Sequence, residues 1–395
     1  MKIKTYNGQT LELNLTTDEN TDHWIALPGL IDPHVHFRTP GAEHKENWES
    51  GAAAAIAGGV TTVFDMPNNT PSIIDEATLN TKIELVKNQL KNVDIPLRNY
   101  FYLGATLDNL DEIEKCKDKI IGVKIFMGAS TGNLLVSKSE IQEKIFRKCA
   151  ELNLVAAVHA EDDELINQQK LKYPQPTIFD HGKIRFDTAA QSAVAKAIDL
   201  AQKTGAKLYI LHTSTAKELE LIKKAKQAGL TIYAEATPHH LFLDESAYDI
   251  LGTKAQMNPP LRTKQDVSAL WQAISQGTID IVGTDHAPHT IEEKALSYPQ
   301  SPSGVPGIET YLPLLLNAHN NGKISLEKIV ELTRSNVQKI FNLPDNNDWV
   351  IVDLKKEKTI KNKDLKTKCS WSPFDSWKIK GWPIYTILNN KIYKI

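Results

Sequence analysis

Eight short apolar runs alternate with helical stretches between residues 24 and 341, and this alternation limits the possible folds more than any other feature. The runs predict buried β-strands because they are short, apolar and rich in branched and aromatic side chains. The predicted strands are Trp24–Ile31, Val60–Met66, Asn99–Gly104, Ile120–Phe126, Leu154–His159, Lys207–His212, Thr231–Ala236 and Asp280–Gly283.

Helical patterns fill the intervals between these runs. The predicted helices are Glu46–Ala57, Asp75–Lys91, Leu107–Lys117, Lys138–Leu152, Phe186–Lys203, Thr215–Ala228, Lys264–Gln276, Ile308–Asn320 and Ser325–Phe341. Eight strands that alternate with helices favour an α/β fold of the (β/α)8 TIM-barrel type. An open doubly wound sheet suits the chain less well, because no glycine-rich phosphate-binding motif follows the first strand.

The two ends of the chain have a different pattern. Residues 1–23 are polar with two short β-like runs, and further short strands are predicted at Trp349–Leu354, Trp377–Lys380, Tyr385–Leu388 and Lys391–Ile395. We expect residues 24–345 to form the barrel, and residues 1–23 and 346–395 to form one small β appendage. The lysine-rich stretch 355–368 is interpreted as a solvated loop.

Charge and cysteine content narrow the class of protein. The 46 basic and 48 acidic residues give a formal net charge of −2, which indicates no polybasic surface for nucleic acid or membrane. The three cysteines are scattered and odd in number, which suits a reducing compartment. The N-terminus lacks the apolar core of a signal peptide, and no apolar run approaches the length of a membrane span. We expect a cytoplasmic protein that binds neither nucleic acid nor membrane.

Side chains able to bind metal lie at the ends of four predicted strands. The first strand runs into His34 and His36, which point to the same side of an extended chain. The fifth strand ends at His159, the sixth at His212, and Asp285 follows the eighth. The carboxyl ends of barrel strands meet at one rim, so these side chains are expected to lie together. One such histidine alone would more often be structural, but the whole set predicts a metal site, since neutral imidazole is the commonest metal ligand.

Lys124 lies between Val123 and Ile125 on the fourth predicted strand, where a charged side chain needs an explanation. A lysine in this setting is most often paired with an acid or extends its ammonium to the surface. However, burial lowers the pKa of an amine, and a neutral amine can react with CO2 to form a carbamate. The carbamate would be an anionic ligand able to bridge two metal ions. We interpret His239 and His240, after the seventh strand, as supporting or structural residues.

The strand-end residues belong to longer segments that resemble the dihydroorotase family of the amidohydrolase superfamily. In order, from about residue 27 to 343, these are PGLIDPHVHFRTPG, FDMPNN, GVKIF, AVHAED, LHTST, EATPHHL, MNPPLR and GTDHAPHTIEEK, followed by SGVPGIE. The His-x-His pair and Asp285 are typical of the whole superfamily. Arg38, directly after HVHF, is more specific when found together with MPNN and DHAPH, because hydantoinases and allantoinases usually lack an arginine there.

The resemblance implies a centre with two metal ions. His34, His36 and Asp285 would hold the more buried ion, His159 and His212 the more exposed one, and N6-carboxylated Lys124 would bridge them. Zinc is the expected metal, two ions per chain, because the ligands are nitrogen and oxygen and the chemistry is hydrolytic. Asp285 would also serve as general base and then as general acid.

The resemblance also implies a group of substrate contacts. Arg38, Asn68 and His289 would bind the substrate carboxylate, Asn258 would contact the pyrimidine ring, and the backbone near Ser303 and Gly304 would complete the pocket. The segment Gly128–Asn133 matches a loop that closes over substrate in relatives.

The implied activity is the reversible conversion of L-dihydroorotate to N-carbamoyl-L-aspartate in pyrimidine biosynthesis. A homodimer and association with aspartate carbamoyltransferase are further implications. Two alternatives remain: another cyclic amidase, such as an allantoinase or a hydantoinase (dihydropyrimidinase), and an inactive relative that serves as a scaffold. Arg38 and Asn68 argue against the first, and the presence of every expected ligand argues against the second.

Overall fold

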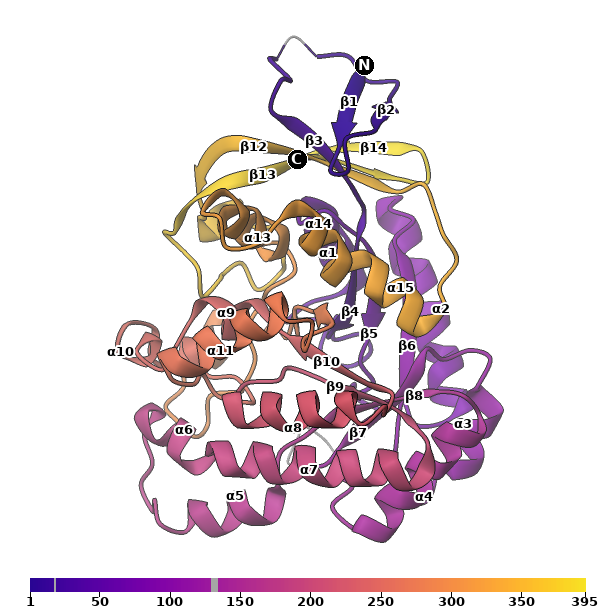
Figure 1. Ribbon diagram of the computed structural model, residues 1–395, viewed down its shortest axis with the longest axis vertical. Coiled ribbons are helices and arrows are strands. Elements are labelled where there is room, and N and C mark those ends of the chain that lie inside the picture. Colours follow the sequence, from indigo (N-terminus) through magenta and orange to yellow (C-terminus); the bar gives the residue numbers. More distant parts are fainter. Residues whose placement is uncertain (18, 129–133) are drawn as a thin grey trace.

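A closed barrel forms the body of the computed structural model, which describes residues 1–17, 19–128 and 134–395 (Figure 1). Eight parallel strands lie in the sheet order β11-β10-β9-β8-β7-β6-β5-β4. They are β4 (Leu30–Val35), β5 (Val60–Asp65), β6 (Arg98–Gly104), β7 (Gly122–Phe126), β8 (Val155–His159), β9 (Lys207–Ile210), β10 (Ile232–Ala236) and β11 (Ile281–Val282). A parallel bridge between Val35 and His286 joins the two ends of this sheet. The predicted (β/α)8 barrel is therefore confirmed.

Helices separate the barrel strands and cover the outside of the barrel (Figure 1). The longer ones are α1 (Trp48–Ala57), α2 (Glu76–Val93), α3 (Leu110–Cys116), α4 (Ser139–Glu151), α5 (Asp163–Lys170), α7 (Asp187–Thr204), α8 (Ala216–Gln227), α11 (Lys264–Ser275) and α13 (Tyr311–Asn320). The shorter ones are α6 (His181–Ile184), α9 (Pro238–Phe242), α10 (Ala247–Leu251), α12 (Ile291–Lys294), α14 (Leu326–Val330) and α15 (Asn336–Phe341). Side-chain caps explain several starts: Asn47, Asp75 and Thr215 each accept the N3 backbone N–H of their helix.

The helix expected at Ser325–Phe341 is interrupted. A π-helical turn, Glu331–Ser335, separates α14 from α15. Arg334 lies in this turn, and its Nη1 donates to the Gly29 carbonyl oxygen at 3.0 Å. The wider turn thus carries a buried arginine that binds the backbone just before the first barrel strand.

The alternation of side chains along β7 explains why its lysine points inward. Val123 and Ile125 pack outward in the core shared with the surrounding helices. Lys124, between them, faces the barrel interior and is 1% exposed. Elsewhere in the interior, Phe341 packs against Phe64 and Tyr209, with ring centroids 5.0 and 5.7 Å apart.

A second sheet joins both ends of the chain (Figure 1). Its order is β14-β13-β12-β3-β1-β2. These strands are β1 (Lys2–Thr5), β2 (Thr10–Glu12), β3 (Trp24–Pro28), β12 (Trp349–Thr359), β13 (Lys378–Leu388) and β14 (Lys391–Lys394). The two strands expected at Trp377–Lys380 and Tyr385–Leu388 are one strand, β13. The expected loop 355–368 begins as strand, because β12 pairs with β13 as far as Thr359.

The strand predicted at Trp24–Ile31 is wrong in its extent. Trp24–Pro28 pairs with β1 and β12 in the terminal sheet, and the first barrel strand begins at Leu30. The switch occurs at Gly29, whose N–H donates to the Asp348 carbonyl at 2.8 Å. A Cβ at Gly29 would lie 2.5 Å from the Thr61 side chain, so only glycine lets the chain pass there. The division of the chain at residues 23/24 and 345/346 stays a prediction.

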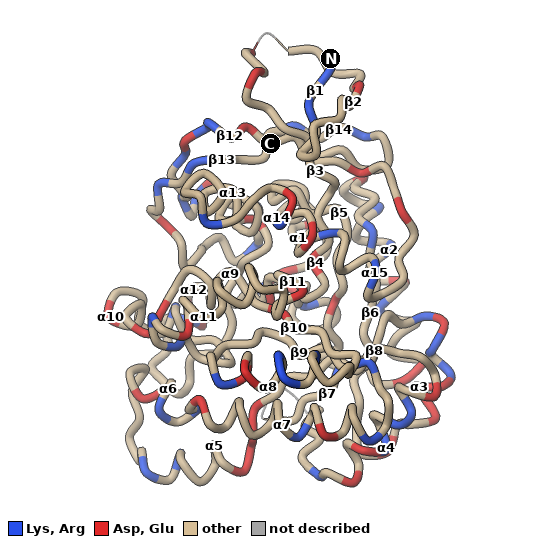
Figure 2. Tube along the Cα trace, viewed as in Figure 1, with Lys and Arg blue, Asp and Glu red and all other residues tan. Residues whose placement is uncertain are grey.

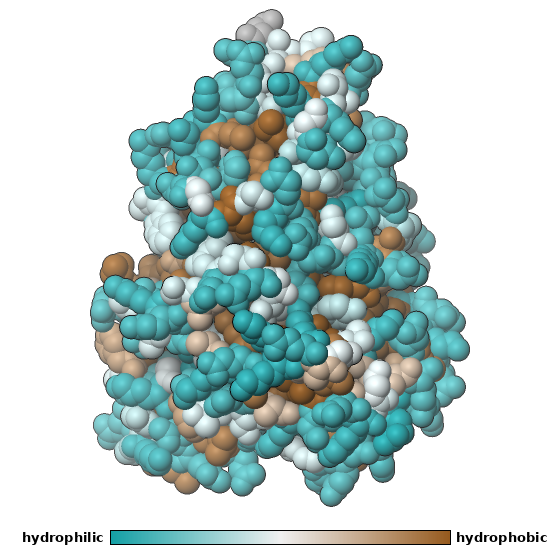
Figure 3. All heavy atoms as spheres, viewed as in Figure 1, coloured by the Kyte–Doolittle hydropathy of each residue, from teal (hydrophilic) through white to brown (hydrophobic). Residues whose placement is uncertain are grey.

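The surface carries both charge signs. Basic and acidic residues are interspersed in the view of Figure 2, in line with the small net charge. Hydrophilic side chains cover most of the face in Figure 3, with apolar patches between them. Among the described residues, no helix is both long enough and apolar enough to cross a membrane.

Candidate metal and substrate site

A small cavity of about 80 Å³ at the carboxyl ends of the barrel strands gathers almost all the predicted site residues. It is lined by His34, His36, Arg38, Asn68, Lys124, Phe126, His159, His212, Asn258, Asp285, Ala287, Ser303 and Gly304. The predicted residue outside this lining is His289, which lies beside Arg38. Of the predicted loop Gly128–Asn133, residues 129–133 lie outside the described part of the chain.

The first cluster consists of His34, His36 and Asp285, whose ligand atoms lie within 4.8 Å of one another. His34 Nδ1 donates to Glu235 Oε1 at 2.8 Å, and His36 Nδ1 donates to Asn68 Oδ1 at 2.7 Å. Burial lowers the pKa of His36 to about 4, so this ring is neutral at pH 7 and its Nε2 carries a lone pair.

The two Nε2 atoms of this cluster lie 3.2 and 3.0 Å from Asp285 Oδ1. With the ring protons on Nδ1, three electron-pair donors face one another with no proton between them. A bound cation would relieve that arrangement, and two imidazoles with one carboxylate are suitable zinc ligands. The side chains present therefore fit a metal ion.

His159 and His212 form a second pair of facing ring nitrogens. His159 Nε2 donates to Glu161 Oε2 at 2.9 Å, which leaves a lone pair on Nδ1. That Nδ1 lies 2.9 Å from His212 Nε2. Burial lowers the pKa of both histidines, so both rings are neutral and can donate a nitrogen lone pair to a metal ion. Arg185 Nε in turn donates to Glu161 Oε1 at 3.1 Å and holds the carboxylate in place.

Lys124 lies in the same cavity without a polar partner in the described part of the chain. Its Nζ is 4.6 Å from the centre of the Phe126 ring. Burial lowers the pKa of Lys124 to about 7, although Asp285 and Glu235 act in the opposite direction. A substantial fraction of the amine is therefore neutral at physiological pH.

Three residues of the site have left-handed backbone conformations that non-glycine residues seldom adopt. The φ angles are 61° at Arg38, 35° at His212 and 46° at Asp285. Each such residue costs about 1–3 kcal/mol, and such strain is typical of functional sites, where surrounding contacts hold a side chain in a required direction.

Arg38 lines one side of the cavity, and His289 lies beside it, outside the lining. Arg38 Nε donates to the Pro288 carbonyl at 3.1 Å, and its Nη2 lies 3.2 Å from His289 Nε2. Lys45 Nζ lies 3.1 Å from His289 Nδ1. Burial, followed by the charges of Arg38 and Lys45, lowers the pKa of His289 strongly, so His289 is neutral and Arg38 carries the positive charge that faces the cavity.

Asn258, Ser303 and Gly304 form another wall. Ser303 Oγ donates to Asn258 Oδ1 at 3.2 Å. The Gly304 N–H donates to the Gln256 carbonyl at 3.0 Å, so this N–H binds the protein rather than facing the cavity. Asn68 binds His36 through Oδ1, which gives it a supporting contact in addition to its predicted role.

Glu235, which binds His34, was missed by sequence reasoning. Its carboxylate also accepts the His212 backbone N–H at 3.0 Å and a hydrogen bond from the Tyr209 hydroxyl. The signal was present, because a carboxylate within the apolar strand Ile232–Ala236 is as unusual as Lys124 in its own strand.

The histidines after β10 are buried behind the site. His240 binds Thr237 Oγ1 through Nδ1 at 2.8 Å and donates from Nε2 to the Pro259 carbonyl at 3.1 Å. His239 Nε2 is buried without a hydrogen-bond partner among the described residues.

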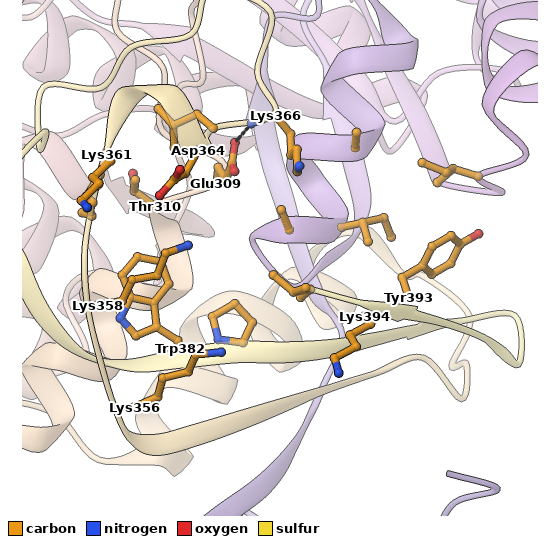
Figure 4. A pocket seen from close by; sticks show the side chains of 18 residues that line it. Glu309, Thr310, Lys356, Lys358, Lys361, Asp364, Lys366, Trp382, Tyr393 and Lys394 are labelled. Atoms are coloured by element: carbon orange, nitrogen blue, oxygen red, sulfur yellow. Dashed lines mark hydrogen bonds between the residues drawn. The ribbon is translucent and has the colours of Figure 1, made fainter. Parts of the chain in front are cut away.

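A larger cavity, of about 380 Å³, lies beside the terminal sheet (Figure 4). Lys356, Lys358 and Lys366 project around it, and Lys358 Nζ lies 5.1 Å from the centre of the Trp382 ring. None of the predicted site residues lines this cavity. It is therefore separate from the cavity of the histidine clusters, which holds the candidate metal ligands.

Comparison with known proteins identifies the family of this chain. The family model described as "Amidohydrolase family" matches residues 25–348. A dihydroorotase from Halobacterium salinarum is 36% identical over 382 residues, covering 93% of this chain and 86% of that protein. A dihydroorotase from Pyrococcus furiosus is 38% identical over 377 residues, covering 93% and 81%. The chain belongs to the dihydroorotase family.

Two further matches are a segment of a larger protein and a solved structure. The multifunctional protein CAD of Squalus acanthias is 35% identical over 388 residues, which cover 98% of this chain and 16% of that protein. Among solved structures, the L-hydantoinase (dihydropyrimidinase) of Arthrobacter aurescens has a TM-score of 0.88 at 26% identity, covering 93% of this chain and 85% of that one. The dihydroorotase family thus shares its barrel with cyclic amidases that are named for other substrates.

Proposed function

We propose that this protein is a dihydroorotase that interconverts L-dihydroorotate and N-carbamoyl-L-aspartate in pyrimidine biosynthesis. The observation that carries the proposal is the position of Arg38, whose side chain lines the cavity that holds His34, His36 and Asp285. A planar guanidinium is suited to a carboxylate. It therefore gives the site a reason to select a ring that bears a carboxylate.

Two zinc ions per chain are proposed for the two histidine clusters. His34, His36 and Asp285 would hold one, His159 and His212 the other, and a carbamate on Lys124 would lie between them. When bound, such a metal pair lowers the pKa of a water and polarises the carbonyl that this water attacks. Carbamate formation suits Lys124, because the reaction requires the neutral amine that burial favours.

The chain's own residues would orient the substrate and move the proton. Arg38, with His289 and Asn68 beside it, would bind the carboxylate, while Asn258 and the backbone near Ser303 and Gly304 would contact the ring. Asp285 would take the proton of the attacking water on its carboxylate and pass it to the leaving ring nitrogen. In the reverse direction, Asp285 would deprotonate the carbamoyl nitrogen as the ring closes. Glu235 would keep the proton of His34 on Nδ1, away from the reacting atoms.

The structural neighbours favour a second candidate function, the hydrolysis of an uncharged cyclic amide such as hydantoin or dihydrouracil. Arg38 argues against it, because such a substrate offers no carboxylate to pair with the half-buried guanidinium. We also propose a homodimer in the cytoplasm. The match to one segment of a multifunctional protein supports an association with aspartate carbamoyltransferase.

The direct test removes and restores the metal and follows both directions of the reaction. Chelator-treated protein should neither hydrolyse dihydroorotate nor cyclise N-carbamoyl-L-aspartate, and Zn²⁺ with bicarbonate should restore both activities. A metal-loaded protein inactive in both directions would contradict the proposal and favour the scaffold alternative. Turnover of hydantoin or allantoin in place of dihydroorotate would keep the chemistry but replace the substrate.

A further inference from the structure

Lys294 is a buried lysine that binds three backbone carbonyls. It ends helix α12, five positions after His289, and its side chain is fully buried. Its Nζ donates to the carbonyl oxygens of Gln256 at 2.9 Å, Pro302 at 2.8 Å and Gly304 at 3.1 Å. Within the described ranges, no carboxylate pairs with it. Burial lowers the pKa of Lys294 to about 7, because an ammonium without a counter-ion is costly to bury. The three carbonyls offset part of that cost by accepting hydrogen bonds from the amine.

The carbonyls that Lys294 binds belong to two segments that lie far apart in the sequence. One segment leads from Gln256 to Asn258, and the other is residues 301–304. Gln256 Nε2 donates to the Ser301 carbonyl at 2.8 Å and to Ser303 Oγ at 3.2 Å. The two segments together form the cavity wall that presents Asn258, Ser303 and Gly304. Lys294 lies behind this wall and joins both parts of it.

The segment around Asn68, which also lines the cavity, is held by another buried lysine, and this one has a counter-ion. Lys82 is also fully buried, and its Nζ donates to the Met66 carbonyl at 3.0 Å and to Asn69 Oδ1 at 2.8 Å. There, Asp65 lies 2.5 Å from Nζ and also accepts the Phe37 N–H at 2.7 Å. The segment that Lys82 holds is therefore fixed by an ion pair, whereas the wall in front of Lys294 depends on one amine and backbone carbonyls.

We propose that Lys294 is a positioning residue for the substrate ring, because it fixes the segment 302–304 against Gln256 so that Ser303 orients the Asn258 amide toward the cavity. This role rests on the proposed dihydroorotase activity. Lys294 itself does not line the cavity, so it acts through the wall. Without the ammonium, the carbonyls of Pro302 and Gly304 would lose the donor they share, and the wall would lose its fixed shape.

The test is Lys294→Met, which keeps the length of the stem and removes the three donors. We expect the KM for dihydroorotate to rise at least about tenfold while kcat falls less than about threefold, since the lost interaction serves ring binding more than the chemical step. Bound zinc should stay at the wild-type level, because no metal ligand is touched. Lys294→Gln, which retains N–H donors on a shorter stem, should give an intermediate KM, and it carries the test if the methionine variant does not fold.

A double-mutant cycle separates positioning from general loss of stability. If Lys294 acts through the wall, Ser303→Ala should raise KM in the wild-type background and add little in the Lys294→Met background. Fully additive effects would overturn the proposal, as would an unchanged KM in Lys294→Met.

Lys226→Met is the matched control. That lysine binds a backbone carbonyl, of Thr278 at 2.9 Å, and Asp280 at the amino end of β11, away from the cavity. It should lower the melting temperature without changing KM. Wild-type protein that fails to turn over dihydroorotate would refute the proposed function itself, a result distinct from active wild type with an unaltered Lys294→Met variant.

Discussion

Replacement of Glu235 by glutamine should weaken zinc binding although Glu235 touches no proposed metal position. Its carboxylate accepts hydrogen bonds from His34 Nδ1 at 2.8 Å, from the His212 backbone N–H at 3.0 Å and from the Tyr209 hydroxyl. Glu235→Gln keeps one carbonyl oxygen and turns the other oxygen into an NH2 group. All three donors then lose a charged acceptor, because the amide is neutral, and an NH2 group facing His34 Nδ1 would favour the tautomer that cannot bind metal through Nε2.

The expected loss follows from that single hydrogen bond. A hydrogen bond to a buried charged acceptor contributes about 1.5–3 kcal/mol. Partners that orient metal-binding histidines typically change affinity or activity by about 10–100-fold, which agrees with this range. We therefore expect the zinc Kd to rise about 10–100-fold and kcat/KM at limiting zinc to fall in parallel.

Zinc affinity can be measured by competition with a chromophoric chelator, with activity followed at each free zinc concentration. Glu218→Gln is the matched control, because Glu218 is also buried and accepts backbone N–H groups, of Ser214 at 3.1 Å and Thr215 at 2.8 Å, at the start of α8. It should lower stability and leave zinc affinity unchanged. A Glu235→Gln variant with zinc affinity within about twofold of wild type would refute the reasoning.

Three further predictions concern Lys124, Arg38 and two buried histidines. Lys124→Ala should keep the fold but lose the bridging ligand and most activity; near-normal activity with two bound metals would exclude the carbamate. Arg38→Met should lower kcat/KM for dihydroorotate by about 10²-fold, since about 2–3 kcal/mol, the lower end of the range for one lost partner of a charge pair in a binding site, suits a half-buried arginine, and it should barely change any hydantoin turnover; equal losses on both substrates would contradict this. Burial lowers the pKa of His181 to about 3 and of His240 to about 4, so below about pH 6.5 the unfolded chain binds protons that the folded chain does not. The stability that these two histidines contribute to the metal-free protein should therefore be complete above about pH 6.5 and fall by up to about 1.4 kcal/mol per pH unit for each histidine as the pH drops toward those values. Burial raises the pKa of Asp32 and of Glu309 to about 7, which acts in the opposite direction, so urea unfolding of the wild type is compared with that of His240→Gln; a stability difference that stays constant from pH 7 to pH 5 would contradict the prediction.

The barrel and the residues at its rim could be predicted from sequence because both depend on local patterns. The apolar neighbours of Lys124 on its strand indicated an unusual lysine, and the common direction of parallel strands brought His159 and His212 to one cavity with Asp285. Those inferences need only the alternation of side chains and the rule that strand ends converge.

The rest depends on contacts that local patterns do not contain. The single apolar run Trp24–Ile31 crosses from one sheet to the other at Gly29, a break set by the approach of Thr61 and Asp348. Glu235 and Lys294 belong to two of the segments that resemble the dihydroorotase family, EATPHHL and GTDHAPHTIEEK. Their roles follow from partners outside those segments, such as His34 and Gln256. An isolated charge in an apolar or loop segment indicates that a partner exists without identifying it.

The comparison of two substrates that differ only by a carboxylate tests the central claim most directly. Zinc-loaded protein should be assayed with dihydroorotate and with dihydrouracil under the same conditions. Because Arg38 is expected to bind the carboxylate, we predict a kcat/KM for dihydroorotate at least about 10³-fold above that for dihydrouracil; fully buried polar sites reach about 10⁴–10⁵-fold, and Arg38 is half-buried. Equal or faster hydrolysis of dihydrouracil would contradict the account and assign the chain the activity for which its structural neighbours are named.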